Sequence, residues 1–141
     1  MSDDFSCDHL FVLSAQIAML FDRAISRQTV AELGVTADQA VALLMLASGN
    51  CRHATDLARE CAVDCSSMTR LIDRLEKRGL LTRSKCTEDR RAWILEATPG
   101  GRRIASEVPR ILDDVHGRLL GDITSADKRR LRGMLRRLRG G

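Results

Sequence analysis

The stretch from Asp64 to Gly79 constrains the fold of this chain more than any other part of its sequence. Asp64 is placed to cap a helix, because its carboxylate can accept hydrogen bonds from the amides of Ser66 or Ser67. Gly79 predicts the end of that helix, since glycine readily adopts the left-handed conformation that terminates helices. The residues between them predict one buried face by their helical spacing: Met68, Leu71, Ile72 and Leu75. A capped, basic, amphipathic helix is therefore expected.

A shorter helix is predicted before this one and a charged hairpin after it. The shorter helix runs from about Ala54 to Cys61, and the turn at Ala62-Val63 makes the pair a helix-turn-helix. Leu80–Thr82 and Trp93–Leu95 have the composition of two strands, and the charged loop Ser84–Arg91 joins them. The expected fold class is mainly α with a small β-hairpin wing, a winged helix-turn-helix.

The first part of the chain predicts two further helices. The first runs from about Asp8 to Ala31 and is apolar on more than one face, which requires a partner surface as well as a core. The second, from Ala37 to about Ala47, begins at a capping box formed by Thr36 and Gln39.

The last part of the chain also has more apolar surface than one protomer can bury. Thr98 and Pro99 begin a long helix that Pro109 is expected to bend, and Ser125 is expected to cap a final helix. We therefore expect a two-fold homodimer with recognition helices about 34 Å apart. Residues 1–141 are expected to form one domain, with dimerisation helices at about 8–33 and 99–141 and the winged helix-turn-helix at about 36–98.

Composition and length favour a globular protein of one domain, since 44% of the 141 residues are hydrophobic and 30% are charged. No apolar run reaches the roughly eighteen residues of a membrane helix, and the acidic N-terminus lacks the features of a secretion signal. A cytoplasmic protein without a membrane partner is expected. Its five cysteines fit no metal-binding spacing and are expected to be mostly free thiols.

Basic charge is concentrated in the middle and the tail of the chain. Residues 1–50 hold two Arg and six acidic residues, whereas residues 51–103 hold twelve Lys or Arg and eight acidic residues. Residues 104–141 hold nine Lys or Arg and five acidic residues. Because basic groups attract phosphates, the middle is the expected site of DNA contacts. No glycine-rich phosphate loop and no Ser/His/Asp arrangement is visible, so neither an enzyme nor a cofactor is expected.

The residues expected to read DNA lie at the start of the Asp64–Gly79 helix and in the hairpin. Side chains at the N-terminal end of a recognition helix enter the major groove. The residues expected on the DNA are Cys65, Ser66, Ser67, Thr69, Arg70, Arg74, Lys85, Arg90 and Arg91. Arg70 could make a bidentate contact to guanine, and Arg74 is better placed for phosphate. Asp89 beside the two wing arginines could orient them for a minor groove.

Three segments of the sequence resemble the MarR family of bacterial transcriptional regulators. They are Leu71–Leu80, Asp89-Arg90-Arg91 and Ala97-Thr98-x-x-Gly101, and Leu33–Gln39 is similar to the start of the family's second helix. His53 departs from the pattern, because the family usually has a Thr or Ser cap there. The resemblance implies a homodimeric repressor, with its first and last helices interleaved as the dimerisation region. Such a repressor would bind a palindromic operator and be released by a small ligand or by cysteine oxidation. It also implies that Asp64 and Asp89 support the wing and that Arg91 enters the minor groove.

The sequence is compatible with two kinds of signal that could release the regulator from DNA. The resemblance suggests a small phenolic or aromatic carboxylate bound between the dimerisation region and the winged helix. The residues that could supply its counter-charge are His9, Arg23, Arg27 and His116. The alternative is a thiol-based redox sensor.

Three cysteines are candidates for such a sensor: Cys65, Cys86 and Cys7. Cys65 is the most interesting, because it lies at the first position of the recognition helix, where helix amides lower a thiol pKa and Asp64 opposes them. A third reading is an architectural DNA-binding protein that senses nothing.

Overall fold

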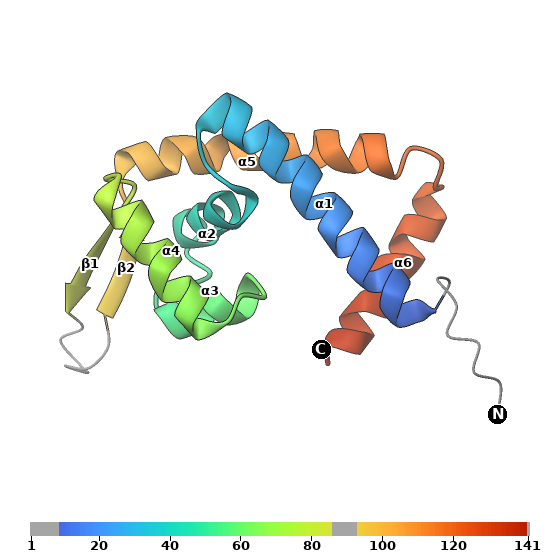
Figure 1. The fold of residues 1–141 in the computed structure, drawn as a ribbon, viewed down its shortest axis with the longest axis horizontal. Coiled ribbons are helices and arrows are strands. Elements are labelled where there is room, and N and C mark those ends of the chain that lie inside the picture. Colours follow the sequence, from blue (N-terminus) through green and yellow to red (C-terminus); the bar gives the residue numbers. More distant parts are fainter. Residues whose placement is uncertain (1–8, 86–92, 141) are drawn as a thin grey trace.

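The computed structural model describes residues 9–85 and 93–140 and confirms a mainly α fold with a two-stranded hairpin. Figure 1 shows the six helices and two strands in this part of the chain. Their bounds are α1 Leu10–Leu33, α2 Ala37–Ala47, α3 Ala54–Glu60, α4 Cys65–Lys77, β1 Leu81–Lys85, β2 Trp93–Ala97, α5 Pro99–Leu119 and α6 Ser125–Arg139.

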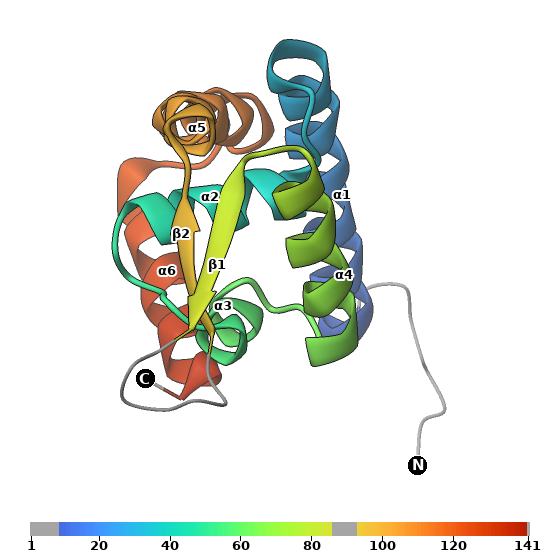
Figure 2. The ribbon, with the colours of Figure 1, turned by 90° about the vertical axis from the view of Figure 1, so that its left-hand side faces the viewer.

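The helices α1 and α5 pack together, and α2 packs against both of them. Figure 2 shows the antiparallel hairpin standing beside α4, so that the first turn of α4 and the open end of the hairpin lie at the same end of the molecule. The start of α5 lies at the opposite end of the hairpin. The chain turns after the far end of α5, and α6 then descends on the same side of α5 as the winged helix (Figure 1).

Three of the four predicted N-caps, Thr36, Asp64 and Thr98, are confirmed by their hydrogen bonds. Both bonds of the capping box form, from the Gln39 amide to Thr36 Oγ1 at 3.3 Å and from the Thr36 amide to Gln39 Oε1 at 3.0 Å. Asp64 caps α4 by accepting from the Ser67 amide at 2.8 Å. Gly79 has a φ of 72°, as a glycine that ends a helix should.

Several predicted boundaries are corrected. The first helix begins at Leu10 rather than Asp8, because His9 Nδ1 accepts from the Phe11 amide at 3.1 Å and caps it. Thr124, and not Ser125, caps α6, since Thr124 Oγ1 accepts from the Asp127 amide at 3.1 Å. Cys61 follows the last residue of α3, and β1 extends to Lys85, two residues into the predicted loop.

The core of the winged helix forms where α2, α3, α4 and the hairpin meet. Its largest fully buried side chains are Leu43, Leu57, Met68, Leu75 and Leu81. The four predicted apolar residues of α4 are all buried. This packing fixes which face of α4 points outward.

The base of the hairpin is joined to α5 by a close contact at Gly101. Thr98 donates from its amide to Leu80 O at 3.1 Å and from its hydroxyl to Gly79 O at 2.7 Å. The same hydroxyl accepts from the Gly101 amide at 3.1 Å and caps α5. A Cβ on Gly101 would overlap the Leu80 carbonyl oxygen, so only glycine fits here.

Within the described ranges, no single helix is long and apolar enough to span a membrane. The helices α1 and α2 reach that length and composition only as a pair, with a bend of 74° between them.

Candidate nucleic-acid interface

The buried face of α4 turns the predicted reading residues toward the surface. Cys65, Ser66, Thr69, Arg70 and Arg74 are exposed, and Ser67 is partly buried. The first turn of α4, where Cys65 and Ser66 lie, is at the same end of the molecule as the open end of the hairpin (Figure 2), and Arg74 lies in the last turn. The structure therefore brings the predicted helix residues together on one outer surface.

The hydroxyl groups on this surface already donate to local acceptors. Ser66 Oγ and Ser67 Oγ donate to the two oxygens of Asp64 at 2.6 and 2.9 Å, and Thr69 Oγ1 donates to Cys65 O at 2.9 Å. With their protons engaged, these hydroxyls present oxygen lone pairs outward and can accept hydrogen bonds. They are thus suited to amino groups on cytosine or adenine in the major groove.

The same bonds keep Asp64 ionised. Hydrogen bonds from Ser66, and then from Ser67, lower the pKa of Asp64 to about 2. All the hydrogen bonds that this carboxylate accepts within the described residues come from the first turn of α4. Its predicted support of the wing stays a prediction, because Asp89, Arg90 and Arg91 lie outside the described residues, as do Cys86 and Cys7.

The open end of the hairpin carries Lys85 and Trp93 opposite each other. Lys85 Nζ lies 6.0 Å from the centroid of the Trp93 ring, within cation–π range, and the Trp93 side chain is exposed. His53 makes no side-chain cap on α3; its Nδ1 instead lies 3.0 Å from Trp93 O. The Leu95 amide donates to Arg52 O at 2.8 Å, so the segment before α3 holds β2 in place.

Two arginines of α4 line a cleft that also contains two acidic residues. The cleft, of about 410 Å³, lies between α1, the start of α2 and α4, and its lining includes Arg70, Arg74, Asp22 and Asp38. Burial, and then the charge of Asp22, raise the pKa of Asp38. Sequence reasoning missed both carboxylates, because nothing local marks them as neighbours of residues more than thirty positions away.

Two of the four predicted effector residues share a groove between α1 and α5. Arg23 and Arg27 line it together with Arg118, and the two adjoining cavities measure about 540 and 350 Å³. His116 packs its ring edge-on to Phe21 with centroids 5.3 Å apart, and His9 caps α1; neither lines the groove.

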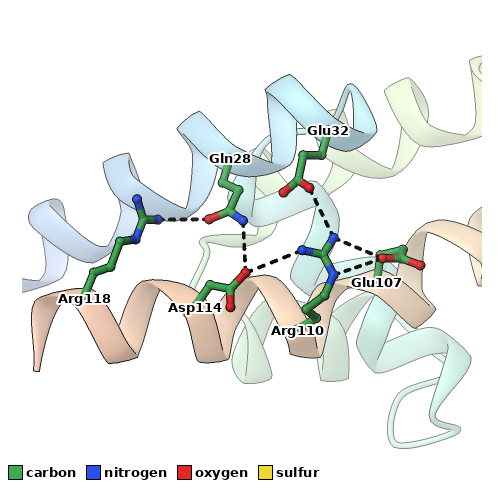
Figure 3. A network of polar contacts seen from close by, with 6 residues as sticks. All are labelled: Gln28, Glu32, Glu107, Arg110, Asp114 and Arg118. Carbon is green, nitrogen blue, oxygen red and sulfur yellow. Dashed lines mark hydrogen bonds and ion pairs between the residues drawn. The ribbon is translucent and has the colours of Figure 1, made fainter. Parts of the chain in front are cut away.

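A network of polar contacts links side chains of α1 to side chains of α5 (Figure 3). Arg110 contacts Glu32 at 3.3 Å, Glu107 at 3.1 Å and Asp114 at 3.5 Å. Gln28 donates to Asp114 at 3.4 Å and accepts from Arg118 at 2.9 Å. Hydrogen bonding to Glu107, followed by the charge of Glu32, raises the pKa of Arg110.

The apolar surplus predicted at both ends is exposed in the single chain. On α1 the exposed apolar residues include Leu10, Phe11, Leu13, Ile17 and Leu20. On α6 they are Leu131, Met134, Leu135 and Leu138, and no residue of α6 is buried within the described part of the chain.

The three cysteines in the described residues differ sharply in environment. Cys51 is buried, Cys61 is partly buried and Cys65 is exposed on α4. Burial, followed by the charge of Cys51, raises the pKa of Cys61 to about 11, and burial also raises the pKa of Cys51. No group of three or more His, Cys, Asp or Glu side chains in residues 9–85 and 93–140 is placed to hold a metal.

Comparison with known proteins matches residues 35–93 to the MarR family model. A probable transcriptional regulator from Pseudomonas aeruginosa is 25% identical, with a TM-score of 0.80 over 93% of this chain and 97% of the other. BpsR from Bordetella bronchiseptica, whose DNA binding is regulated by 6-hydroxynicotinic acid, is 24% identical, with a TM-score of 0.86 over 99% of each chain.

MepR from S. aureus in complex with DNA is 17% identical, with a TM-score of 0.79 over 92% of this chain and 96% of the other. The resemblance found in the sequence is thereby confirmed: residues 35–93 carry the MarR family pattern, and the chain has the fold of MarR-family transcriptional regulators.

Proposed function

We propose that this chain is a repressor that binds a palindromic operator as a homodimer and releases it when a small ligand binds. The observation that carries the proposal is the outer surface of α4, where Arg70 and the acceptor hydroxyls of Ser66 and Thr69 stand beside the open end of a basic hairpin. MepR, which has the same fold, forms a complex with DNA, and this supports DNA binding by the chain.

The exposed apolar faces of α1 and α6 support a second copy of the chain as the partner. A helix such as α6, with four apolar residues exposed along one side, is stable in water only when that side is covered. A two-fold axis would let the terminal helices of each protomer cover those of the other and would place two copies of α4 on one face of DNA. In this arrangement residues 1–141 act as one domain.

The groove between α1 and α5 supports an anionic effector. Three arginines along an apolar floor that includes Leu20, Ala24 and Val115 suit an aromatic or phenolic carboxylate. BpsR responds to such an acid. We therefore assign Arg23, Arg27 and Arg118 to this site ahead of His9 and His116.

Operator binding is tested by selecting DNA from a random-sequence library and titrating the selected duplex by fluorescence anisotropy. Arg70→Ala should weaken binding about tenfold to a hundredfold, because a bidentate contact to guanine carries that much discrimination. Arg102→Ala is the matched control: Arg102 is exposed at the start of α5, at the opposite end of the hairpin. Equal losses in the two variants would refute a reading role for α4.

A redox-sensing regulator is the second candidate, and Cys65 favours it. It is the exposed cysteine among the three described, and it stands on the DNA-facing surface, where an oxidised sulfur would block the contact. Peroxide should release DNA from the wild type but not from Cys65→Ser if this candidate is correct. An architectural protein would instead bind scrambled DNA as tightly as the selected duplex.

A further inference from the structure

Arg83, on β1, links the hairpin to the recognition helix. Its guanidinium contacts the Asp73 carboxylate through Nη2, and its Nε lies 3.4 Å from Glu76 Oε2. Asp73 and Glu76 stand one turn apart on α4. The Arg83 side chain is only 26% exposed, and its Nε is buried with no hydrogen bond in this conformation. A guanidinium held in this way is oriented toward α4 and away from solvent.

The register of the hairpin explains why this contact matters. Leu81, Arg83 and Lys85 occupy one face of β1, opposite Ala97, Leu95 and Trp93 on β2. Along this face Leu81 is 1% exposed and Leu95 is 3% exposed, whereas Trp93 at the open end is 47% exposed. Apolar packing therefore holds the hairpin from its base to the Arg83–Leu95 pair and does not reach its open end. Toward the open end, Arg83 makes the ion pairs that join β1 to α4 in the described part of the chain.

We propose that Arg83 is a positioning residue of the DNA interface. It fixes the angle between the hairpin and α4, so that the wing and the recognition helix reach adjacent grooves as one rigid unit. This role rests on the proposed function, because it presumes that both elements touch DNA. The sequence alone predicted no role in DNA binding for Arg83 or its two carboxylate partners.

Arg83 could instead act on DNA binding by contacting a phosphate directly. The variant Asp73→Asn distinguishes this direct contact from a positioning role. Removing a negative charge from the recognition helix should tighten DNA binding if only long-range electrostatics matters. A positioning role predicts weaker DNA binding by Asp73→Asn, because the substitution frees Arg83 and loosens the hairpin. We expect binding of the selected duplex to weaken about tenfold, the effect of losing one charge-assisted hydrogen bond.

Glu96→Gln is the matched control for this variant. Glu96 is exposed on β2 and forms no ion pair within the described residues, so its substitution removes the same charge from the hairpin without touching Arg83. Its DNA affinity should be equal to that of the wild type or slightly tighter.

Trp93 provides a readout that does not require DNA. It is the single tryptophan of the chain and lies at the open end of the hairpin, so its fluorescence anisotropy reports how firmly the hairpin is held. In the full-length protein without DNA, Arg83→Gln and Asp73→Asn should both lower this anisotropy while circular dichroism shows unchanged helix content. Glu96→Gln should leave it unchanged.

The outcomes are distinct. Weaker binding by Asp73→Asn together with a mobile Trp93 supports the proposal. Binding equal to or tighter than that of the wild type, with unchanged Trp93 anisotropy, overturns it. If Arg83→Gln fails to fold, Asp73→Asn alone carries the test. If the wild type selects no DNA, the proposed function fails, and the Trp93 anisotropy still decides whether Arg83 holds the hairpin.

Discussion

Replacing Gly101 by alanine should destabilise the protein, whereas the same change at its neighbour Gly100 should not. A Cβ at Gly101 would overlap the Leu80 carbonyl oxygen and lie 3.2 Å from Leu43 Cδ2. The Leu80 carbonyl cannot retreat freely, because it accepts the Thr98 amide at 3.1 Å. A Cβ at Gly100 meets only ordinary contacts, 3.7 Å from Leu80 Cδ2 and from Thr98 Oγ1.

The magnitude follows from two opposing effects. Overpacking against backbone costs about 3 kcal/mol, the upper part of the usual range, because the clashing atom is held by a hydrogen bond. Replacing glycine by alanine in a helix returns at most about 1 kcal/mol. Gly101→Ala should therefore lose about 2 kcal/mol of unfolding free energy, and Gly100→Ala should gain up to about 1 kcal/mol, a separation of about 3 kcal/mol.

Urea unfolding followed by circular dichroism at one fixed protein concentration measures this separation. With a slope of about 2 kcal/mol per molar urea, the midpoints of the two variants should differ by about 1.5 M. Coincident midpoints would refute the reasoning, since both variants make the same chemical change in the first turn of the same helix. A lower midpoint for Gly100→Ala than for Gly101→Ala would refute it as well.

Three further predictions concern acid stability, thiol reactivity and assembly. Asp64 has a folded pKa of about 2, below its ordinary 3.8, so its cap stabilises the fold above pH 3.8 and is lost as the pH falls through 2. The difference in thermal midpoint between wild type and Asp64→Asn should therefore shrink as the pH falls from 3.8 to 2, and it should stay constant above pH 3.8. When native protein is labelled with a disulfide reagent, Cys65→Ser should remove one fast-reacting thiol. Cys61→Ser should not, since a pKa of about 11 leaves little thiolate at Cys61. Fast phases of equal amplitude in the two variants would contradict this prediction. Leu135→Glu should convert a dimer into monomers in light scattering, because it places a charge on the exposed apolar face of α6, and an unchanged mass would count against that face as the interface.

The parts of the fold that depend on local rules could be predicted from the sequence. Thr36, Asp64 and Thr98 cap the helices for which they were proposed, and Gly79 ends α4, because each effect involves residues within a few positions. The one misplaced cap, at Ser125, is an error of one position between two hydroxyl residues that can both cap a helix.

Contacts between distant residues could not be predicted in the same way. His53 lacks a capping bond, as its departure from the family pattern suggested, but its actual neighbour, Trp93 O, lies forty positions away. No sequence pattern distinguishes Arg83 from the other charged residues near the predicted loop, so its ion pair with Asp73 could not be predicted. The carboxylates beside Arg70 and Arg74 were missed for the same reason.

These distant contacts determine the orientation of the reading surface. The last turn of α4 is tied to the end of α1, because Arg78 donates to Gly34 O at 2.8 Å. The second half of α4 is also tied to β1 through Arg83, and the apolar face of the helix is buried in the core. The residues proposed to read DNA are identified by where the helix begins, but the orientation of their surface depends on α1, the core and the hairpin together. Under the proposed function, a substitution at Gly34, Arg78 or Arg83 would therefore change DNA binding although none of these residues is proposed to face a groove.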